Sequence, residues 1–334
     1  MAPAAALEAP NVTAAICTHR RPAQLRRALR SLRGQTEPPA EILVVDNAPA
    51  GDETRAVVLG EFPGVRYVRE AAAGLDFARN RALAEATSDI VAFLDDDAVA
   101  DPVWVAATRA VFRDNPVVLV CTGRVDALSL DTEGARLFEA NGGFARGADR
   151  IRLPRDQSRT LHGARAPLVA WAISVGSGCS FAVRRTDALA MGGFDEALDL
   201  GEALPGGGDL DMIYRALARG RDVVYEPAIR ARHEHRADAR AVAHQIAEHN
   251  RALVAWLTKL LVRSRGRRRA EVLAFLLWRL AKPGVRLARR AARRDPLGPR
   301  ALARLWWAGW RGLVAYPAAR RLARQRRDRR DGSA

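Results

Sequence analysis

Short apolar runs alternate with amphipathic segments along the first 125 residues. Five runs predict buried strands, at residues 12–17, 42–46, 65–68, 90–94 and 117–120. Between them, apolar residues recur at helical spacing at residues 23–32, 75–86 and 103–112. This alternation predicts an α/β fold with a mostly parallel sheet that has helices on both faces.

The pattern is less regular in the middle of the chain. Residues 175–183 predict a strand whose glycines let a ligand approach the backbone, and residues 223–227 predict the last strand. Residues 129–168 are rich in Arg, Gly and Pro and weakly periodic. They predict a mobile segment that acts as a lid or binds an acceptor.

Polar residues gather where the predicted strands end. They are Thr18, Arg21, Asp46, Asn47, Gly74 and the triplet Asp95, Asp96 and Asp97. Each of them alone is compatible with a helix cap or a turn. Because ligands of such sheets bind beyond the carboxyl ends of the strands, the set together favours a ligand site.

The aspartate triplet at residues 95–97 follows an apolar strand directly. Three adjacent carboxylates repel one another unless a cation lies among them. Hard oxygen ligands on a short loop suit Mg²⁺ or Mn²⁺, which retain waters and bridge to phosphate oxygens. The alternative is an acidic turn that caps the helix after Pro102.

Composition limits the protein class. A chain of 334 residues with 49% hydrophobic residues can form one large α/β domain with an appendage, or two modest domains. The three cysteines, Cys17, Cys121 and Cys179, are widely spaced and form no CxxC pair, which favours a reducing cytosol over a disulfide framework or a zinc site. The first ten residues lack the pattern of a signal peptide and are expected to be a loose tail.

The positive charge is concentrated at one end of the chain. The formal net charge is +16, but residues 1–250 hold 30 basic and 34 acidic residues, whereas residues 251–334 hold 24 basic and 4 acidic ones. The excess therefore describes the C-terminal quarter and not the predicted sheet domain.

This C-terminal quarter has three apolar segments, at residues 253–262, 272–280 and 302–316, and none reaches the ~18 apolar residues of a membrane span. They are amphipathic, and one face of the last segment carries Leu302, Leu305, Trp306, Gly309, Leu313 and Tyr316. Five of the seven tryptophans lie in this quarter. Tryptophan with arginine predicts contact with an anionic membrane surface; the alternative is that the helices fold back onto the catalytic domain.

Six motifs in order carry a family resemblance. They are residues 18–22 (THRRP), 44–47 (VVDN), 74–80 (GLDFARN), 93–97 (FLDDD), 192–196 (GGFDE) and 208–215 (GDLDMIYR). Together they resemble the family-two glycosyltransferases, which have a GT-A fold. The resemblance implies a Rossmann-like GT-A catalytic domain over residues 11–236, with a donor half at 11–125 and an acceptor half at 126–236. Residues 237–334 follow as a basic helical extension.

The resemblance also implies roles for the donor half. A nucleoside-diphosphate sugar, with a UDP-sugar favoured, lies across the strand ends, and a divalent metal on Asp97 holds its diphosphate. Nucleotide-sugar contacts are implied for Thr18, Arg21, Asp46, Asn47, Gly74, Arg79, Asp95 and Asp96. Asp46 corresponds to the residue that binds the base, and Asp95 lies toward the ribose or base.

In the acceptor half, Asp209 aligns with the catalytic base of the family, although Gly208 stands where the family usually has Glu. A plain helix cap is the alternative for Asp209, and Asp211 is the next candidate base. The acceptor region is assigned to Gly178, Asp195, Glu196 and Asp211. His233 is favoured over His235 as a further metal ligand; the alternative is a hydrogen bond to the diphosphate.

These features predict a metal-dependent, inverting glycosyltransferase, peripheral on the cytoplasmic face of the membrane, with a lipid-linked or cell-envelope acceptor. A sugar-phosphate nucleotidyltransferase is an alternative that lacks a glycine-rich, lysine-containing loop after the first strand. A protein that binds nucleic acid or another anionic surface through the basic tail is a second alternative. It leaves the six motifs unexplained, so no nucleic acid is expected as a partner.

Overall fold

The computed structural model describes residues 9–154, 160–161, 164–289 and 295–332. The loose tail expected at residues 1–10 therefore lies outside the described residues, apart from its last two. The same holds for parts of the predicted lid, residues 155–159 and 162–163.

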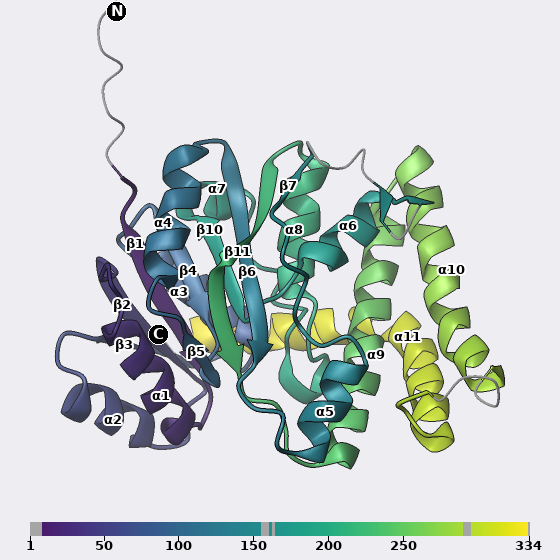
Figure 1. The fold of residues 1–334 in the computed structure, drawn as a ribbon, viewed down its shortest axis with the longest axis horizontal. Coiled ribbons are helices and arrows are strands. Elements are labelled where there is room, and N and C mark those ends of the chain that lie inside the picture. Colours follow the sequence, from purple (N-terminus) through teal and green to yellow (C-terminus); the bar gives the residue numbers. More distant parts are fainter. Residues whose placement is uncertain (1–8, 155–159, 162–163, 290–294, 333–334) are drawn as a thin grey trace, which may run out of the picture.

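A nine-stranded sheet forms the centre of the molecule (Figure 1). Its strand order is β3-β2-β1-β4-β10-β6-β11-β5, and β7 pairs with β11. The strands are β1 (Val12–Thr18), β2 (Glu41–Asn47), β3 (Arg66–Glu70), β4 (Ile90–Leu94), β5 (Ala98–Ala100), β6 (Val118–Ala127), β7 (Ile151–Leu153), β10 (Ser180–Arg184) and β11 (Asp222–His233). Only β5, β7 and β10 run against the others, which confirms the mostly parallel sheet.

Helices cover both faces of this sheet, as predicted. On one face lie α1 (Pro22–Arg33), α2 (Glu53–Glu61) and α4 (Trp104–Asp114). On the other lie α3 (Leu75–Glu85), α6 (Leu168–Val175), α7 (Arg185–Ala190) and α8 (Gly208–Ala218). Helix α1 illustrates the local cause, because Pro22 starts it and Leu25, Ala28, Leu29 and Leu32 recur on its buried face.

The predicted strand at residues 175–183 is wrong in its first part. Residues Leu168–Val175 form helix α6, a loop follows, and only Ser180–Arg184 form a strand, β10. A short, fully apolar run has no periodicity that separates a buried helix from a buried strand. The sequence also failed to predict α2, and the segment 129–168 contains the helix α5 (Glu133–Ala140). Its role as a lid stays a prediction.

The C-terminal region is helical, as predicted, with α9 (Ala239–Arg263), α10 (Gly266–Ala288) and α11 (Pro299–Asp331). Helix α11 packs along α9 and then crosses behind the sheet, so that its last turns reach the N-terminal half (Figure 1). There, Arg330 Nη1 lies 3.8 Å from Glu70 Oε2. No helix among the described residues is both long enough and apolar enough to cross a membrane.

The expected apolar stripe of residues 302–316 mostly faces protein. Four residues of the stripe are buried: Leu302, Leu305, Gly309 and Tyr316. Their burial agrees with the alternative in which the helices fold back onto the domain. Trp306 is 40% exposed. The division of the chain at residue 236 into a catalytic domain and an extension stays a prediction. The two parts share a core, because α9 contributes the fully buried Trp256 to the cluster that includes residues of α8.

Candidate donor and metal site

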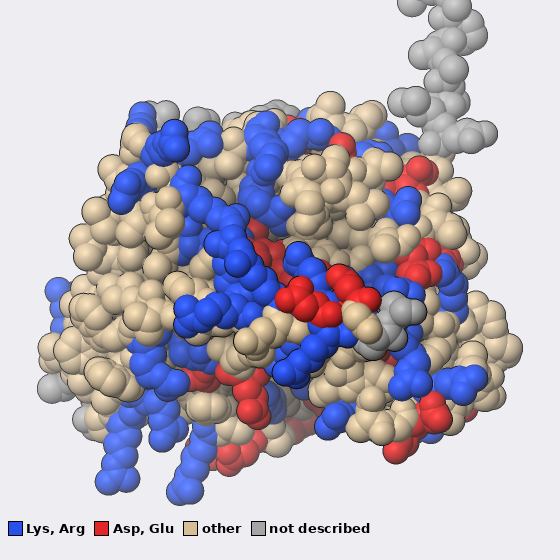
Figure 2. Space-filling view, turned by 180° about the vertical axis from the view of Figure 1, so that it is seen from behind, with Lys and Arg blue, Asp and Glu red and all other residues tan. Residues whose placement is uncertain are grey.

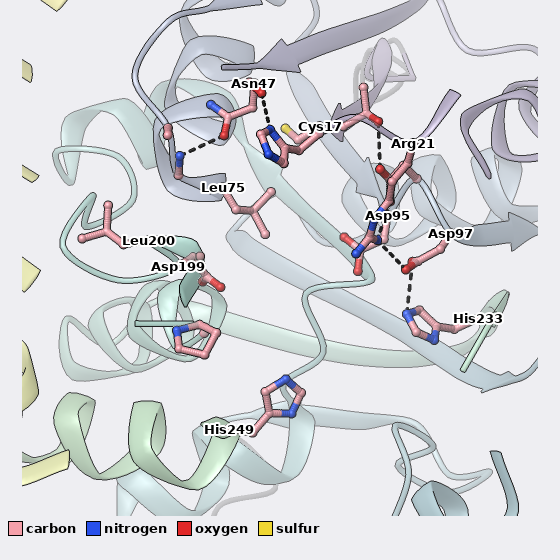
Figure 3. Close-up of a pocket in the computed structure, with 18 of the residues that line it drawn as sticks. Cys17, Arg21, Asn47, Leu75, Asp95, Asp97, Asp199, Leu200, His233 and His249 are labelled. Atoms are coloured by element: carbon pink, nitrogen blue, oxygen red, sulfur yellow. Dashed lines mark hydrogen bonds and ion pairs between the residues drawn. The ribbon is translucent and has the colours of Figure 1, made fainter. Parts of the chain in front are cut away.

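A cavity of about 450 Å³ opens where β1, β2 and β4 end (Figure 3). Its wall includes Thr18, Arg21, Asn47, Gly74 and the triplet Asp95, Asp96 and Asp97 from the donor half. The parallel strands end at the same edge, so loops far apart in the sequence meet there. The structure thus brings together most of the predicted nucleotide-sugar residues.

Two hydrogen-bonding groups hold the middle of the triplet. Thr18 Oγ1 donates to Asp96 Oδ2 at 2.8 Å, and Arg21 Nη1 lies 3.2 Å from Asp96 Oδ1 and 2.8 Å from Asp97 Oδ2. Asp96 is therefore tied to the loop after β1, and Arg21 offsets part of the negative charge. Burial raises the pKa of Asp96 to about 6, although Arg21 acts against this.

Asp95, Asp97 and His233 offer ligand atoms within 4.8 Å of one another. His233 Nε2 lies 3.1 Å from Asp97 Oδ1. Two carboxylates and one imidazole form a donor set that suits Mn²⁺. The residues present therefore fit the predicted metal.

His235 lies behind His233 and not beside the carboxylates. Its Nδ1 is 3.1 Å from His233 Nδ1, and its Nε2 is 2.8 Å from Glu139 Oε1. Such a partner fixes the orientation of a ligating imidazole. This geometry supports His233 as the candidate ligand.

The pKa values of Asp95, Asp97 and His233 are shifted because the three side chains are buried close together. Burial raises the pKa of Asp95, and the Asp97 charge adds to the effect. Burial alone would raise the pKa of Asp97 as well, but the hydrogen bond to His233 and the charges of His233 and Arg21 together outweigh it and lower the pKa. Burial alone would lower the pKa of His233, but the hydrogen bond to Asp97 and the charges of Asp97 and Asp95 together outweigh it and raise the pKa. A cluster of this kind attracts a cation.

Asp46, the predicted contact to the base, is not among the described residues that line the cavity, and one of its oxygens is unsatisfied. Asp46 is fully buried; its Oδ2 accepts a hydrogen bond from Tyr67 at 2.8 Å, whereas its Oδ1 has no partner among the described residues. Asn47 Oδ1 accepts from Gly74 N at 2.8 Å, and this bond joins two walls of the cavity. An N–H group of a bound base would satisfy the free Asp46 oxygen.

Arg79 lies beneath the cavity instead of lining it. It is 4% exposed and pairs with Asp76 at 3.1 Å and Asp199 at 3.4 Å. Burial by itself lowers the pKa of Arg79, but the carboxylates of Asp199 and Asp76 outweigh it and raise the pKa. In this structure Arg79 ties α3 to the loop before α8.

The cavity wall also contains charged and imidazole side chains to which the sequence analysis gave no role, namely His19, Asp199, His249 and Arg326. Asp199 has a positive φ of 50°, its Oδ2 accepts from Gly208 N at 2.8 Å, and burial raises its pKa to about 6. His249 and Arg326 come from α9 and α11, outside every motif. Of these four, only His19 lies inside one of the six motifs, residues 18–22.

Asp209 lies in the first turn of α8, where the helix dipole favours a carboxylate. Within the described residues, its carboxylate forms no hydrogen bond or ion pair. A Cβ on Gly178 would lie 3.3 Å from Asp209 Oδ2 and 2.7 Å from Arg79 Nη2, so the glycine leaves space beside both charges. Asp209 is not among the described residues that line the donor cavity, and its role as the base stays a prediction.

The structure explains why position 208 is a glycine and not the glutamate usual in the family. A Cβ at this position would lie 2.0 Å from Asp76 Oδ2 and 2.4 Å from Asp76 Oδ1. Asp76 is fully buried, and its Oδ2 has no hydrogen-bond partner in the described part of the chain. The carboxylate of Asp76 thus fills the space next to α8 that a side chain at position 208 would need.

The remaining acceptor-region residues surround a different cavity, of about 280 Å³. Lys259 Nζ lies 2.6 Å from Asp195 Oδ2 and 2.5 Å from Asp211 Oδ1, and Arg327 pairs with Glu196. Asp211 is fully buried and also pairs with Arg215 at 2.7 Å. These three carboxylates hold α9 and α11 against the domain, and their predicted acceptor role stays a prediction.

The sequence was then compared with known families. The family model described as "Glycosyl transferase family 2" matches residues 13–189, which is more than half of the chain. The chain belongs to glycosyl transferase family 2. The matched range of this family 2 chain includes Asp95 and Asp97, whereas His233, the third member of the trio, lies beyond residue 189.

Two curated relatives are similar to this family 2 chain. The succinoglycan biosynthesis protein ExoM of Rhizobium meliloti is 30% identical over 259 residues, which cover 75% of this chain and 71% of ExoM. A pre-mycofactocin glycosyltransferase of Mycobacterium tuberculosis is 28% identical over 232 residues, which cover 69% of this chain and 44% of that protein. The chain thus spans less than half the length of the mycobacterial relative.

A solved structure agrees with the fold. The mannosyltransferase PcManGT from Pyrobaculum calidifontis, in complex with GDP-Man and Mn²⁺, superposes with a TM-score of 0.56 at 18% identity, covering 94% of this chain and 86% of that one. Together with the sheet order, this confirms the GT-A-type fold of this family 2 chain.

Proposed function

We propose that the protein is a metal-dependent glycosyltransferase that moves a sugar from a nucleoside-diphosphate sugar to an acceptor hydroxyl. The observation that carries the proposal is the trio Asp95, Asp97 and His233 in the wall of the strand-end cavity. The family, the GT-A-type fold and the names of the relatives support it.

The chain's own residues account for binding. The free oxygen of Asp46 accepts a hydrogen bond from the base, while the Asn47 to Gly74 bond shapes the wall around the nucleotide. Asp95, Asp97 and His233 hold Mn²⁺ or Mg²⁺, and Thr18 and Arg21 fix the loop of the triplet. When bound, the metal supplies positive charge that stabilises the leaving diphosphate.

Asp209 is the proposed general base. It takes the proton of the acceptor hydroxyl, which attacks the anomeric carbon on the side opposite the leaving group. A single displacement of this kind inverts the anomeric configuration. The lack of a hydrogen bond to the Asp209 carboxylate within the described residues leaves it ready for this proton.

Binding of the donor product tests the proposal directly. UDP and GDP are each added to the whole protein with Mn²⁺, with Mg²⁺ or with EDTA, and the melting temperature is measured. At 100 times its dissociation constant, a ligand stabilises the fold by about 2.7 kcal/mol, so we expect a clear upward shift for one nucleotide with metal. No shift with either nucleotide at millimolar concentration would contradict the proposal.

The acceptor is proposed to be lipid-linked or part of the cell envelope, and the protein to act as a peripheral protein on the inner membrane face. Trp307 is 66% exposed, Trp310 is 45% exposed and Val314 is 73% exposed on one side of α11. Seen from behind, basic side chains gather across the molecule (Figure 2). Exposed tryptophan with arginine suits an anionic bilayer.

Vesicle binding tests this membrane proposal. We expect the protein to sediment with vesicles that contain anionic lipid, and to bind less as salt rises, because charge attraction decays over a Debye length. Exchanging both Trp307 and Trp310 for Ala should weaken binding about tenfold or more. Leu59→Ala, which removes an apolar side chain that is 55% exposed on α2, serves as the control. Equal binding by the tryptophan variant would refute this surface.

A further inference from the structure

We propose that a second cavity, beside the donor cavity, binds a phosphate or diphosphate group of the acceptor. This proposal rests on the proposed function and deepens it, since it assigns the acceptor a chemical class: a sugar joined through phosphate to an apolar chain. None of the six sequence motifs lies in this cavity.

The cavity measures about 720 Å³ and lies between the segment that follows α5 and helices α6, α9, α10 and α11. His249 lines both this cavity and the donor cavity, so the two are neighbours (Figure 3). Burial lowers the pKa of His249, and the nearby Asp209 carboxylate acts in the opposite direction. His249 therefore belongs to the wall between the two cavities.

Four cations line the second cavity. Arg279, Lys282 and Arg286 follow one another at helical spacing on one face of α10, and Arg146 lies opposite, after α5. Arg286 pairs with Asp295 at 2.7 Å. Within the described residues, no carboxylate pairs with the other three, so the cavity holds an excess of positive charge.

The bonds that these cations do make are to neutral groups. Arg146 donates to the carbonyl oxygens of Gly176 at 3.2 Å and Gly143 at 3.3 Å, and Arg279 donates to Asn250. The Nε of Arg279 is buried and has no hydrogen-bond partner in the described structure. A buried charged group with an unpaired N–H is unfavourable, and an anion bound beside Arg279 in the cavity would offset its buried charge.

Like charges make the cluster costly without an anion. Burial lowers the pKa of Arg279 to about 10, and the Arg286 charge adds to this. Burial, Arg279 and Arg286 likewise lower the pKa of Lys282. Several donors that converge from guanidinium and ammonium groups suit an anion with several oxygens and more than one charge, which a phosphate or diphosphate provides and a single carboxylate does not.

The apolar part of the ligand has a place next to this cluster. Phe138, Phe144, Ile246 and Leu253 line the same cavity. A smaller cavity of about 340 Å³ shares Lys282 and Arg286 with it and includes Trp278 and Val285, which are 49% and 45% exposed. The cations thus lie between an exposed apolar surface and the wall shared with the donor cavity. This order matches an acceptor whose phosphate separates an apolar chain from a sugar.

The test uses farnesyl diphosphate, inorganic pyrophosphate and farnesol as probes of the whole protein. Binding is measured by calorimetry in EDTA, so that the metal trio cannot capture the diphosphate. We expect farnesyl diphosphate to bind best, pyrophosphate more weakly, and farnesol least. Because the measurement needs neither metal nor donor, a failure of the proposed function would appear separately, in the nucleotide experiment.

Two variants locate the site. Arg279→Gln and Lys282→Gln should each weaken farnesyl diphosphate binding about 10-fold to 100-fold, as expected when a hydrogen bond to a charged group is lost. Arg304→Gln, on the exposed side of α11, is the control that keeps the affinity. Lys282→Gln, which removes a repelling cation and no hydrogen bond within the described residues, should not lower the melting temperature, and this separates a binding role from a structural one.

Two outcomes would overturn the proposal. One is the absence of farnesyl diphosphate binding in EDTA, or binding that both variants retain. The other is that Lys282→Gln weakens sedimentation with anionic vesicles while the soluble diphosphate fails to bind, which would make the cations contacts for membrane headgroups instead of an acceptor site.

Discussion

Exchanging Asp209 for Asn is expected to lower sugar transfer by about 10²- to 10⁴-fold, the range typical of the loss of a general base. Asparagine keeps the size of the side chain and its place in the first turn of α8, but it cannot accept the acceptor's proton. Because the Asp209 carboxylate makes no hydrogen bond or ion pair within the described residues, the exchange should leave the melting temperature nearly unchanged. Turnover at saturating donor measures the effect.

Donor binding is the control for this variant. Asp209→Asn should bind the nucleoside diphosphate with metal as tightly as the wild type, because the trio of residues 95, 97 and 233 is intact. Transfer at the wild-type rate would show that another group removes the proton. Asp199, whose pKa burial raises to about 6, would then be the first residue to test, since it lines the donor cavity whereas Asp211 is fully buried in ion pairs.

Asp97→Ala is expected to abolish the part of nucleotide binding that depends on metal. Asp97 lies 3.1 Å from His233 Nε2 and belongs to the only group of three candidate ligands found among the described residues. Removing its carboxylate leaves Asp95 and His233, which are too few to hold Mn²⁺ against water. The upward shift in melting temperature that UDP or GDP with Mn²⁺ produces in the wild type should disappear in the variant.

Asp101→Ala is the matched control, because Asp101 follows β5, four residues after Asp97, but lies near Arg230 and Arg232, outside the donor cavity. It should respond to nucleotide and Mn²⁺ as the wild type does. The variant Asp97→Ala should still melt cooperatively without ligand, because Arg21 keeps its ion pair with Asp96 at 3.2 Å. A nucleotide shift that keeps its dependence on Mn²⁺ in Asp97→Ala would remove Asp97 from the metal site.

The helical tail had two competing interpretations, and the structure divides its residues between them. Leu302 and Tyr316 are buried against the protein, while Trp307 and Trp310 are exposed. A periodic pattern identifies a face of a helix but not what covers that face. Arg326 makes the same point, since a basic residue near the end of the chain lines the donor cavity and donates to the Ala73 carbonyl oxygen.

Local patterns determined much of the architecture. Strands β1, β2 and β4 and helices α1, α3 and α4 follow from apolar runs and helical spacing, because burial on one or both faces imposes a period on the sequence. The polar residues at the strand ends, from Thr18 to the triplet at 95–97, could be assigned to one edge because parallel strands end on the same side.

Tertiary packing alone decided the remaining features. Gly208 looked like the loss of a carboxylate, yet the Asp76 carboxylate from α3 occupies the space beside it, 132 positions away in the sequence. His249 carries no motif and lines the donor cavity only because α9 packs beside it. The cations of α10 also carry no motif, and they line the neighbouring cavity because α10 packs beside α9. The periodicity of a segment shows which of its faces is buried. It does not show which distant element contacts that face, because this depends on how the surfaces of the elements pack together.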